Sequence, residues 1–474
     1  MPEKMHSMRS LVSFDMKKTN NVLQKTENRE QILSGSLLSA ILMLAIPVMA
    51  NSFLQTMYNL TDTYWLGRLG TEELAAINLV TPVQSMVINF GSGITVAGSV
   101  LISQYVGAKR DEDARSMANH IFVCAMGFAV LCAAGCAMAT PAIVKWLGAT
   151  GETFLCGKVY LQLVILDMPF LYMVNMYAAI NQAQGDTLRP MLMNVLGITL
   201  NMILDPLFMV VFRWGVAGAA LATVTAKAVP AVFAFILLHN RKRLLYLELS
   251  RLKFEKEKLK SILVVGLPSA IGGSTTQLGF LLMSKSVFKY GTQAMAAYGI
   301  GNKVNGLITL PSNGIGSAVA IIVGQNVGAN QWNRARDGYL LSRRISVVFL
   351  LVGGMILSRA PVATAIVSIF SEDAAVIKMA ADFLSIMAFW CFANGVYNST
   401  IGLFQGSGHT AVNMAVDIAR LWVFRFATLY ICEEFLHMGV RSIWYSVVVS
   451  NGIAAVVLYL VYRTGYWKHS ISKE

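Results

Sequence analysis

Charged residues are scarce in this sequence. Only 13% of the 474 residues are Asp, Glu, Lys or Arg, whereas 55% are hydrophobic. A soluble globular domain carries about 25% charged residues. The composition therefore excludes an ordinary soluble domain and predicts a protein that crosses a membrane many times.

The sequence also lacks the motifs of common enzyme and metal sites. It contains neither H-E-x-x-H nor G-x-S-x-G, and its six cysteines form no C-x-x-C pair. The net charge of +13 arises from basic residues spread between apolar runs, so it does not indicate a nucleic-acid partner. We therefore expect a protein that is not an enzyme, has no cofactor and has the lipid bilayer as its surroundings.

What the chain has in abundance is long apolar runs. We predict twelve spans, each near or above the roughly 20 residues that crossing a bilayer requires. They are expected at about 38–66, 73–106, 114–140, 153–184, 188–212, 214–239, 260–289, 293–327, 335–358, 374–406, 410–433 and 438–463. Lys and Arg concentrate in the tails and in alternate connections, and cytoplasmic connections are rich in these residues. Both termini are therefore predicted to be cytoplasmic, in a multi-pass protein of the cytoplasmic membrane (the cell inner membrane).

The two halves of the chain repeat one another. A shift of 221 residues places Pro47 on Pro268, and the motif Q-x-V-G-A at Gln104 on the same motif at Gln325. Six spans is an even number, so both copies enter the membrane from the same side. Parallel repeats of this kind typically form two lobes around a central cleft. We predict an all-α protein with two pseudo-symmetric six-helix lobes.

The predicted spans and the repeat divide the chain into five parts. We expect a cytoplasmic tail over 1–36, a first lobe over 37–240, a basic cytoplasmic linker over 241–259, a second lobe over 260–464 and a cytoplasmic tail over 465–474.

The first span carries a polar stripe. Its residues share one helical face: Asn51, Gln55, Tyr58, Asn59 and Asp62. An ionisable side chain at membrane depth is costly and faces protein or a water-filled path. The stripe is therefore either a packed polar face or part of a transport pathway, and we favour the pathway.

The fifth and sixth spans offer partners for Asp62. Asn201 and Asp205 lie one turn apart on the fifth span, and Thr223 lies on the sixth. Two carboxylates, an amide oxygen and a hydroxyl are hard ligands that suit a proton or a sodium ion. These four residues are the predicted cation site, with H+ and Na+ both open.

The second lobe does not repeat this acidic set. Asp62 falls on Met283, and the eleventh span carries Arg420 and Arg425. We therefore expect the first lobe to handle the ion and a cavity to handle the substrate. The candidate cavity residues are Gln55, Tyr58, Asn59, Asn194, Lys285, Asn398 and Arg420.

Basic residues within the spans permit two interpretations. They are Lys227, Lys285, Lys303, Arg420 and Arg425. They either favour anionic or zwitterionic substrates, or they pair with the aspartates Asp167, Asp382 and Asp417 or snorkel to the membrane surface.

Several motifs together resemble one known family. They are YNLTDTYWLGRLGTEELAA after Pro47, the two Q-x-V-G-A motifs, QGDTLRPM, LNMILDPLF and GVAGAALAT. The sequence resembles the multidrug and toxic compound extrusion (MATE) transporters, and within them the DinF-like branch.

The resemblance implies a monomeric antiporter. It would export drugs or metabolites, typically an organic cation or an amphiphile, in exchange for H+ or Na+. The resemblance places the cation at Asp62, Asn201, Asp205 and Thr223, and it implies that the first helix bends at Pro47. A lipid-linked saccharide flippase of the same superfamily is the alternative; a passive channel and an intramembrane enzyme are disfavoured.

Overall fold

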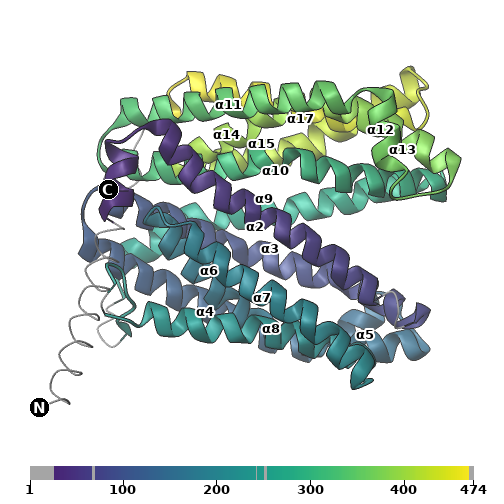
Figure 1. The fold of residues 1–474 in the computed structure, drawn as a ribbon, viewed down its shortest axis with the longest axis horizontal. Coiled ribbons are helices and arrows are strands. Elements are labelled where there is room, and N and C mark those ends of the chain that lie inside the picture. The colour runs from purple at the N-terminus through teal and green to yellow at the C-terminus, as the bar shows by residue number, and fades with distance from the viewer. Residues whose placement is uncertain (1–25, 67–69, 242, 250–253, 469–474) are drawn as a thin grey trace, which may run out of the picture.

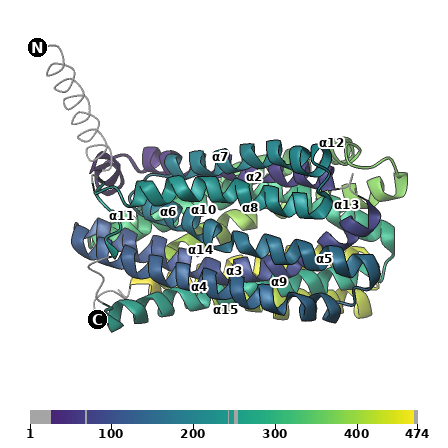
Figure 2. The ribbon, with the colours of Figure 1, turned by 90° about the horizontal axis from the view of Figure 1, so that it is seen from below.

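The computed structural model describes residues 26–66, 70–241, 243–249 and 254–468. These residues form long helices joined by short turns, and no strand occurs among them. The helices lie in two bundles that run along the same long axis (Figure 1, Figure 2). The predicted all-α membrane fold is confirmed.

In the described part of the first half, a helical stretch over 26–33 is followed by seven helices and two irregular segments. They are α2 (Leu37–Leu66), α3 (Thr71–Gly107), α4 (Asp111–Trp146), α5 (Gly151–Val164), the 3₁₀ turn η1 (Ile165–Asp167), α6 (Met168–Ala183), α7 (Leu188–Pro206), the π-helical η2 (Leu207–Val211) and α8 (Gly215–Leu238).

The second half follows the same order with more interruptions. It comprises α9 (Lys256–Phe288), α10 (Thr292–Gly328), α11 (Trp332–Leu357), α12 (Ala360–Val367), α13 (Ala374–Trp390), α14 (Phe392–Gly406), α15 (Thr410–Ile418), the π-helical η4 (Ala419–Arg425), α16 (Phe426–Tyr430), the π-helical η5 (Ile431–Phe435), α17 (Arg441–Arg463) and the 3₁₀ turn η6 (Tyr466–Lys468).

Most of these helices are long and apolar enough to cross a membrane. In the described part of the chain nine helical runs meet that test, and the pair α13 and α14, bent by 55°, makes a tenth. The 33-residue α9 and the run from α15 through η5 complete the predicted twelve. The short α12 was not predicted, because eight residues at the end of an apolar run carry too little periodicity to mark a separate helix.

Two helices pass from one bundle into the other. Ile41 and Leu44 of α2 pack in one hydrophobic core with Ile322 of α10 and Leu458 of α17. In the repeat-related position, Val265 of α9 packs in the core of the first bundle. Thus α2 and α9 each begin in the core of the opposite bundle, although the sequence assigns each helix to one lobe.

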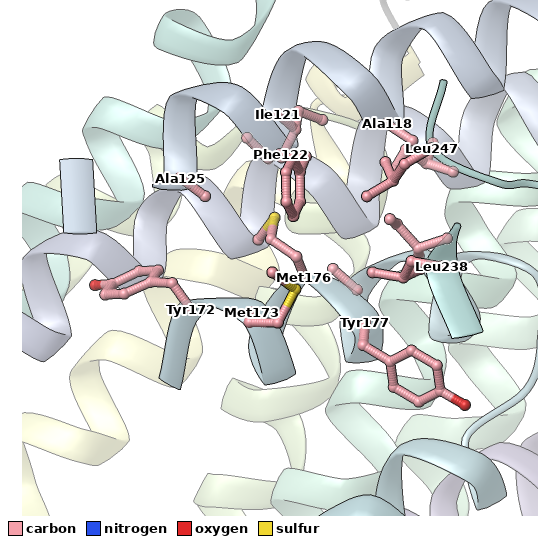
Figure 3. Packing of buried hydrophobic residues seen from close by; sticks show 14 of the residues in the cluster. Ala118, Ile121, Phe122, Ala125, Tyr172, Met173, Met176, Tyr177, Leu238 and Leu247 are labelled. Carbon is pink, nitrogen blue, oxygen red and sulfur yellow. The ribbon is translucent and has the colours of Figure 1, made fainter. Parts of the chain in front are cut away.

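The core of the first bundle is built mainly from α4 and α6. Figure 3 shows Phe122 of α4 facing Met173 and Met176 of α6, with Leu238 of α8 close by. Residues of this kind fill the interior with close-packed apolar side chains. The core holds α6 in place, and α6 supplies part of the wall of the site described below.

Hydrogen bonds between helices of the two halves fasten the bundles together at one end. Gln104 on α3 donates from Nε2 to the carbonyl of Gly406 at 3.0 Å, and Gln325 on α10 donates to the carbonyl of Ala183 at 2.8 Å. Residues near both ends of the described chain lie here, since Trp332 contacts Trp467 and Arg334 bonds the carbonyl of Ile32. We call this end of the molecule the terminal end. From it the two bundles spread apart toward the opposite end (Figure 1).

Glycine permits the close crossing of α3 and α10 at the terminal end. A Cβ added at Gly107 would lie 1.9 Å from the backbone oxygen of Gln325, and one added at Gly328 would lie 1.9 Å from that of Gln104. Any side chain there would force the two helices apart. The repeated Q-x-V-G-A motif therefore forms the contact between the bundles.

Candidate functional site

The first bundle contains a small cavity between α2, α6, α7 and α8, with a largely apolar wall and a few polar side chains. Its volume is about 100 Å³. Its polar lining consists of Gln55, Tyr58, Asn194, Asn201, Thr223 and Lys227. The structure thus brings five of the predicted site residues together, from three separate helices.

Asp205 lies directly beneath this lining. Asn201 donates from Nδ2 to Oδ1 of Asp205 at 3.2 Å. Both side chains are buried, at 2% and 1% exposure. Oδ1 of Asn201 and Oδ2 of Asp205 have no hydrogen-bond partner within the described ranges. Buried oxygens normally accept a hydrogen bond, so two unsatisfied oxygens side by side mark this place as unusual.

The chain is locally irregular where Asp205 sits. Pro206 follows it and has no N–H to donate to the carbonyl four residues earlier, at Met202. The helix then widens into the π-helical turn η2. Single π turns inside α-helices occur frequently at functional sites.

Asp62 reaches the same site from α2. Its carboxylate interacts electrostatically with Asp205 and with the ammonium group of Lys227. Beside it, Tyr58 and Thr223 line the cavity, and the Thr223 hydroxyl donates to the carbonyl of Ala219 at 3.1 Å. Asp62 and Asp205 thus interact electrostatically, Asn201 is hydrogen-bonded to Asp205, and Thr223 lines the adjoining cavity.

A buried ion pair borders this cluster. Lys227 on α8 is bonded to Asp167, whose side chain is fully buried. Gln84 on α3 lies 3.5 Å from the same carboxylate oxygen. Pairing of the basic residues within the spans with aspartates was one of two interpretations of the sequence, and the structure confirms it for Lys227 and Asp167. The position of Lys227 beside the predicted cation site was not foreseen.

The second bundle encloses a larger cavity of about 470 Å³. Amide side chains dominate its lining: Asn302, Asn305, Asn313, Asn394, Asn398 and Asn451. Arg420, Arg425, Tyr298 and Tyr397 lie among them. Of the candidate substrate residues, Asn398 and Arg420 are therefore here rather than in the first bundle.

Hydrogen bonds fix the polar side chains of this second cavity. Asn398 donates to Oδ1 of Asn313 at 2.7 Å and to Oγ of Ser312 at 3.1 Å. Arg420 donates to Oδ1 of Asp417 at 3.1 Å, so this pairing, too, was correctly anticipated.

Three predicted residues lie elsewhere. Asn59 is exposed and accepts from Gln55 at 3.5 Å. Lys285 is exposed on α9 and does not line either cavity. Pro47 lies inside α2, which continues unbroken on both sides of it.

A hydroxyl group compensates for the hydrogen bond that Pro47 lacks. Proline at position 47 leaves the carbonyl of Met43 without its helical donor. Thr187, from the QGDTLRPM motif of the first bundle, donates its hydroxyl to that carbonyl at 3.2 Å. The proline is thus tied to the turn that precedes α7, the helix of Asn201 and Asp205.

Apart from Asn398, the asparagines that line the second cavity were not predicted from the sequence. Those on α10, at 302, 305 and 313, share one helical face with Thr309, and 394 and 398 lie one turn apart on α14. The same periodicity that revealed the stripe of the first span marks these positions. No group of three His, Cys, Asp or Glu that suits a metal ion occurs in the portion of the chain that the structure describes.

Comparison with known proteins gives consistent matches over most of the chain. A family model described as MatE matches residues 47–207 and 268–431, which begin at the two repeat-related prolines. A protein of Bacillus subtilis named "probable multidrug resistance protein YpnP" is 24% identical over 443 residues, covering 92% of this chain and 96% of that protein.

Solved structures match equally well. A MOP superfamily transporter from Pyrococcus furiosus has a TM-score of 0.86 at 28% identity, covering 93% of this chain and 98% of its own. A multidrug resistance MATE family transporter solved in an outward-facing conformation has a TM-score of 0.87 at 27% identity, covering 92% and 97% of the two chains.

Proposed function

Because this chain belongs to the MatE family, whose members are transporters and not enzymes, we propose that it is a secondary active antiporter. It exports drugs or metabolites across the cytoplasmic membrane and takes up a cation in exchange. The relative from Bacillus subtilis is named for multidrug resistance, which supports export over the flipping of lipid-linked saccharides.

One observation carries the proposal. In the first bundle Asp62 and the buried Asp205 form an acidic cluster, in which Oδ2 of Asp205 has no hydrogen-bond partner among the described residues. Two carboxylates in a medium of low dielectric constant repel each other strongly, so a bound cation stabilises the pair. Binding and release of that cation then drive the transport cycle.

The position of Lys227 favours H+ over Na+ as the coupling ion. Its ammonium group lines the cavity and forms an ion pair with Asp167, so this part of the site already holds a cation. A second, metal cation beside this ammonium group is disfavoured, whereas a proton forms a covalent O–H bond and leaves a neutral carboxylic acid. We therefore assign the site to a proton.

The movement that we propose is rocking of the two lobes about the terminal end, combined with bending of α2 at Pro47. We place the terminal end in the cytoplasm and keep the lobes over 37–240 and 260–464, with the linker 241–259 between them. Parallel repeats around a fixed site support alternating access of this kind. The protein functions as a monomer in this account.

Counter-transport in proteoliposomes tests the proposal. A pH gradient and a sodium gradient are imposed separately, with ethidium as a cationic probe and phenylphosphate as an anionic one. We expect uptake of a probe under the pH gradient alone. Uptake under the sodium gradient alone would reassign the ion, and equal uptake without either gradient would contradict antiport.

A further inference from the structure

The cavity of the second bundle contains a cation, Arg425, that no acidic side chain of the described residues neutralises. Arg425 on η4 is 1% exposed. Its Nε donates to Oγ of Ser450 and its Nη2 to Oδ1 of Asn451, both at 3.1 Å. Both acceptors are neutral, and Nη1 has no hydrogen-bond partner in the described chain.

The neighbouring charges do not compensate for Arg425. Arg420 forms an ion pair with Asp417, so the charge of Asp417 is already neutralised. The Asp417 carboxylate also accepts a hydrogen bond from Tyr397. The guanidinium of Arg420 lies 4.7 Å from the centre of the Tyr397 ring. Within the described residues no carboxylate forms an ion pair with Arg425, so this cavity has an excess positive charge.

An uncompensated charge at this depth is unfavourable for the empty protein. Removing a charge from water costs several kcal/mol unless a partner of opposite sign accompanies it. The guanidinium group is planar and matches the geometry of carboxylate and phosphate oxygens. Ser450 and Asn451 fix the plane of the group and leave the third nitrogen to a ligand.

The rest of the cavity suits a small organic molecule. Its volume is about 470 Å³. Phe280, Tyr298 and Val447 supply an apolar wall, and the Phe280 ring lies 6.0 Å from the guanidinium carbon of Arg425. The amide side chains opposite supply neutral hydrogen-bonding groups.

We propose that this cavity binds organic anions, in which a carboxylate or phosphate group contacts Arg425 and Arg420 while an apolar body packs against Phe280 and Tyr298. This inference rests on the proposed function, because it names the substrate class of the same antiporter. It replaces the organic cation that the family resemblance implied. The two lobes then bind opposite charges, the coupling cation in one and the substrate anion in the other.

Binding to the wild-type protein is the first test. Three probes share one aromatic ring and differ in charge: benzoate, phenylphosphate and benzylammonium. Isothermal titration calorimetry of the full chain in neutral detergent measures each affinity. We expect at least one of the two anions to bind about tenfold or more tightly than benzylammonium. Equal affinities, or tighter binding of the cation, would overturn the proposal without any variant.

A pair of variants then locates the site. Arg425→Gln removes the charge but keeps a donor for Ser450, and we expect anion affinity to fall by about tenfold to a hundredfold. Lys285→Gln is the control, since it removes one exposed positive charge from the same lobe. Loss of anion binding in Lys285→Gln but not in a folded Arg425→Gln would contradict the assignment.

A lipid headgroup carries the same chemistry as a free organic phosphate. We therefore repeat the titration in nanodiscs of phosphatidylcholine with and without phosphatidylglycerol. If phosphatidylglycerol competes with the probe, the occupant of the cavity is a lipid anion. If it does not compete, the occupant is a free organic anion. The binding assay needs no ion gradient, so the two proposals can fail separately. If the protein binds anions but shows no gradient-driven transport, only the antiport proposal is rejected. If it shows antiport but no preference for anions, only the proposed anion site is rejected.

Discussion

Two buried side chains of opposite charge distinguish the lobes. Asp205 in the first bundle and Arg425 in the second are each about 1% exposed and each lacks a full set of partners. Buried charges are normally paired, because desolvation is costly. We therefore propose that each of these residues binds a ligand of the opposite charge.

Lys227→Met is expected to destabilise the fold. The substitution leaves the fully buried carboxylate of Asp167 without its counter-ion. Removing one partner of a buried ion pair typically lowers the free energy of unfolding by about 3 to 5 kcal/mol. We expect a loss of about 3 kcal/mol here, because Lys227 is 28% exposed. The unfolding temperature in detergent measures the effect.

The double variant Lys227→Met with Asp167→Leu is the matched control for that prediction. It removes both charges and is expected to recover most of the lost stability. A double variant no more stable than the single one would show that the pair does not contribute as described.

Glu255 gives a pH dependence outside the membrane. It precedes α9, and its hydrogen bond from Lys258, at 2.9 Å, lowers its pKa below the ordinary value of 4.5. A lowered folded-state pKa stabilises the protein above the unfolded-state value, and this contribution is lost as pH falls through the folded-state value.

Glu255→Gln is therefore expected to lower the unfolding temperature slightly at pH 7, because the carboxylate is half exposed. The difference from wild type should vanish well below pH 4.5. Glu152→Gln, an exposed site on α5, serves as control. A difference that persists undiminished at low pH would rule out the ion pair as its cause.

Sequence periodicity found part of each site. It identified Gln55, Tyr58 and Asp62 because they lie on one face of one helix. It did not predict that Lys227 lies beside them, or that the charge of Arg425 lacks an acidic partner in the second cavity. Both features depend on contacts between helices that are far apart in the chain. Periodicity within a helix contains no information about which other helix it faces.

At the level of helices, α2 connects the two sites. It begins in the core of the second bundle and ends against the first, where Leu66 is buried with Met209. Pro47 lies between these two halves. A helix anchored in both bundles, with a weakened hydrogen-bond ladder between its anchors, must bend when the bundles move.

Pro47→Ala is expected to abolish or strongly reduce coupled transport while raising stability. Alanine restores the bond to the carbonyl of Met43 and favours a straight helix. Transport in proteoliposomes and the unfolding temperature measure the two effects.

Thr187→Val is the companion to that prediction, because it keeps the proline but removes the hydroxyl that bonds the carbonyl of Met43. We expect it to destabilise the protein by about 1 kcal/mol. Full coupled transport by Pro47→Ala would exclude bending at this position from the mechanism.

The crossing of α3 and α10 holds the terminal end closed. Gln104→Leu leaves the carbonyl of Gly406 without its donor, which disfavours the closed arrangement by about 1 kcal/mol, or about fivefold in population. Spin labels on Glu112→Cys and Asn333→Cys, in a background without the native cysteines, report the separation of the bundles there.

Pseudo-symmetry supplies the control for the crossing. Gln325→Leu removes the repeat-related bond to Ala183 and should widen the distance distribution to a similar extent. An unchanged distribution in both variants would show that these bonds do not close the terminal end.

The helices themselves were largely predictable. Apolar run length located the spans to within a few residues, as α2 and α10 illustrate. The interruptions were not predictable, since η1 and η4 lie inside apolar sequence with no glycine or proline among their own residues. Packing against neighbouring helices, which a single sequence does not reveal, determines where a helix widens.

For the whole molecule, the structure combines a symmetric frame with asymmetric sites. The repeat places α2 against α10 and α9 against α3, and it places the two glutamines at one crossing. The acidic cluster and the cationic cavity break this symmetry. In the proposed rocking motion, the environments of the proposed cation site and of the proposed substrate cavity would change together, which is what exchange requires.

The most direct test of this account compares Asp205→Asn with wild type in proteoliposomes that contain the pH indicator pyranine. The control is Asp337→Asn, a half-exposed carboxylate at the terminal end. We predict that wild type and the control move ethidium or phenylphosphate with an opposite flux of protons. Asp205→Asn should unfold at a similar temperature but move neither probe nor protons. Wild-type coupled transport by Asp205→Asn would contradict the central claim that this carboxylate carries the exchanged cation.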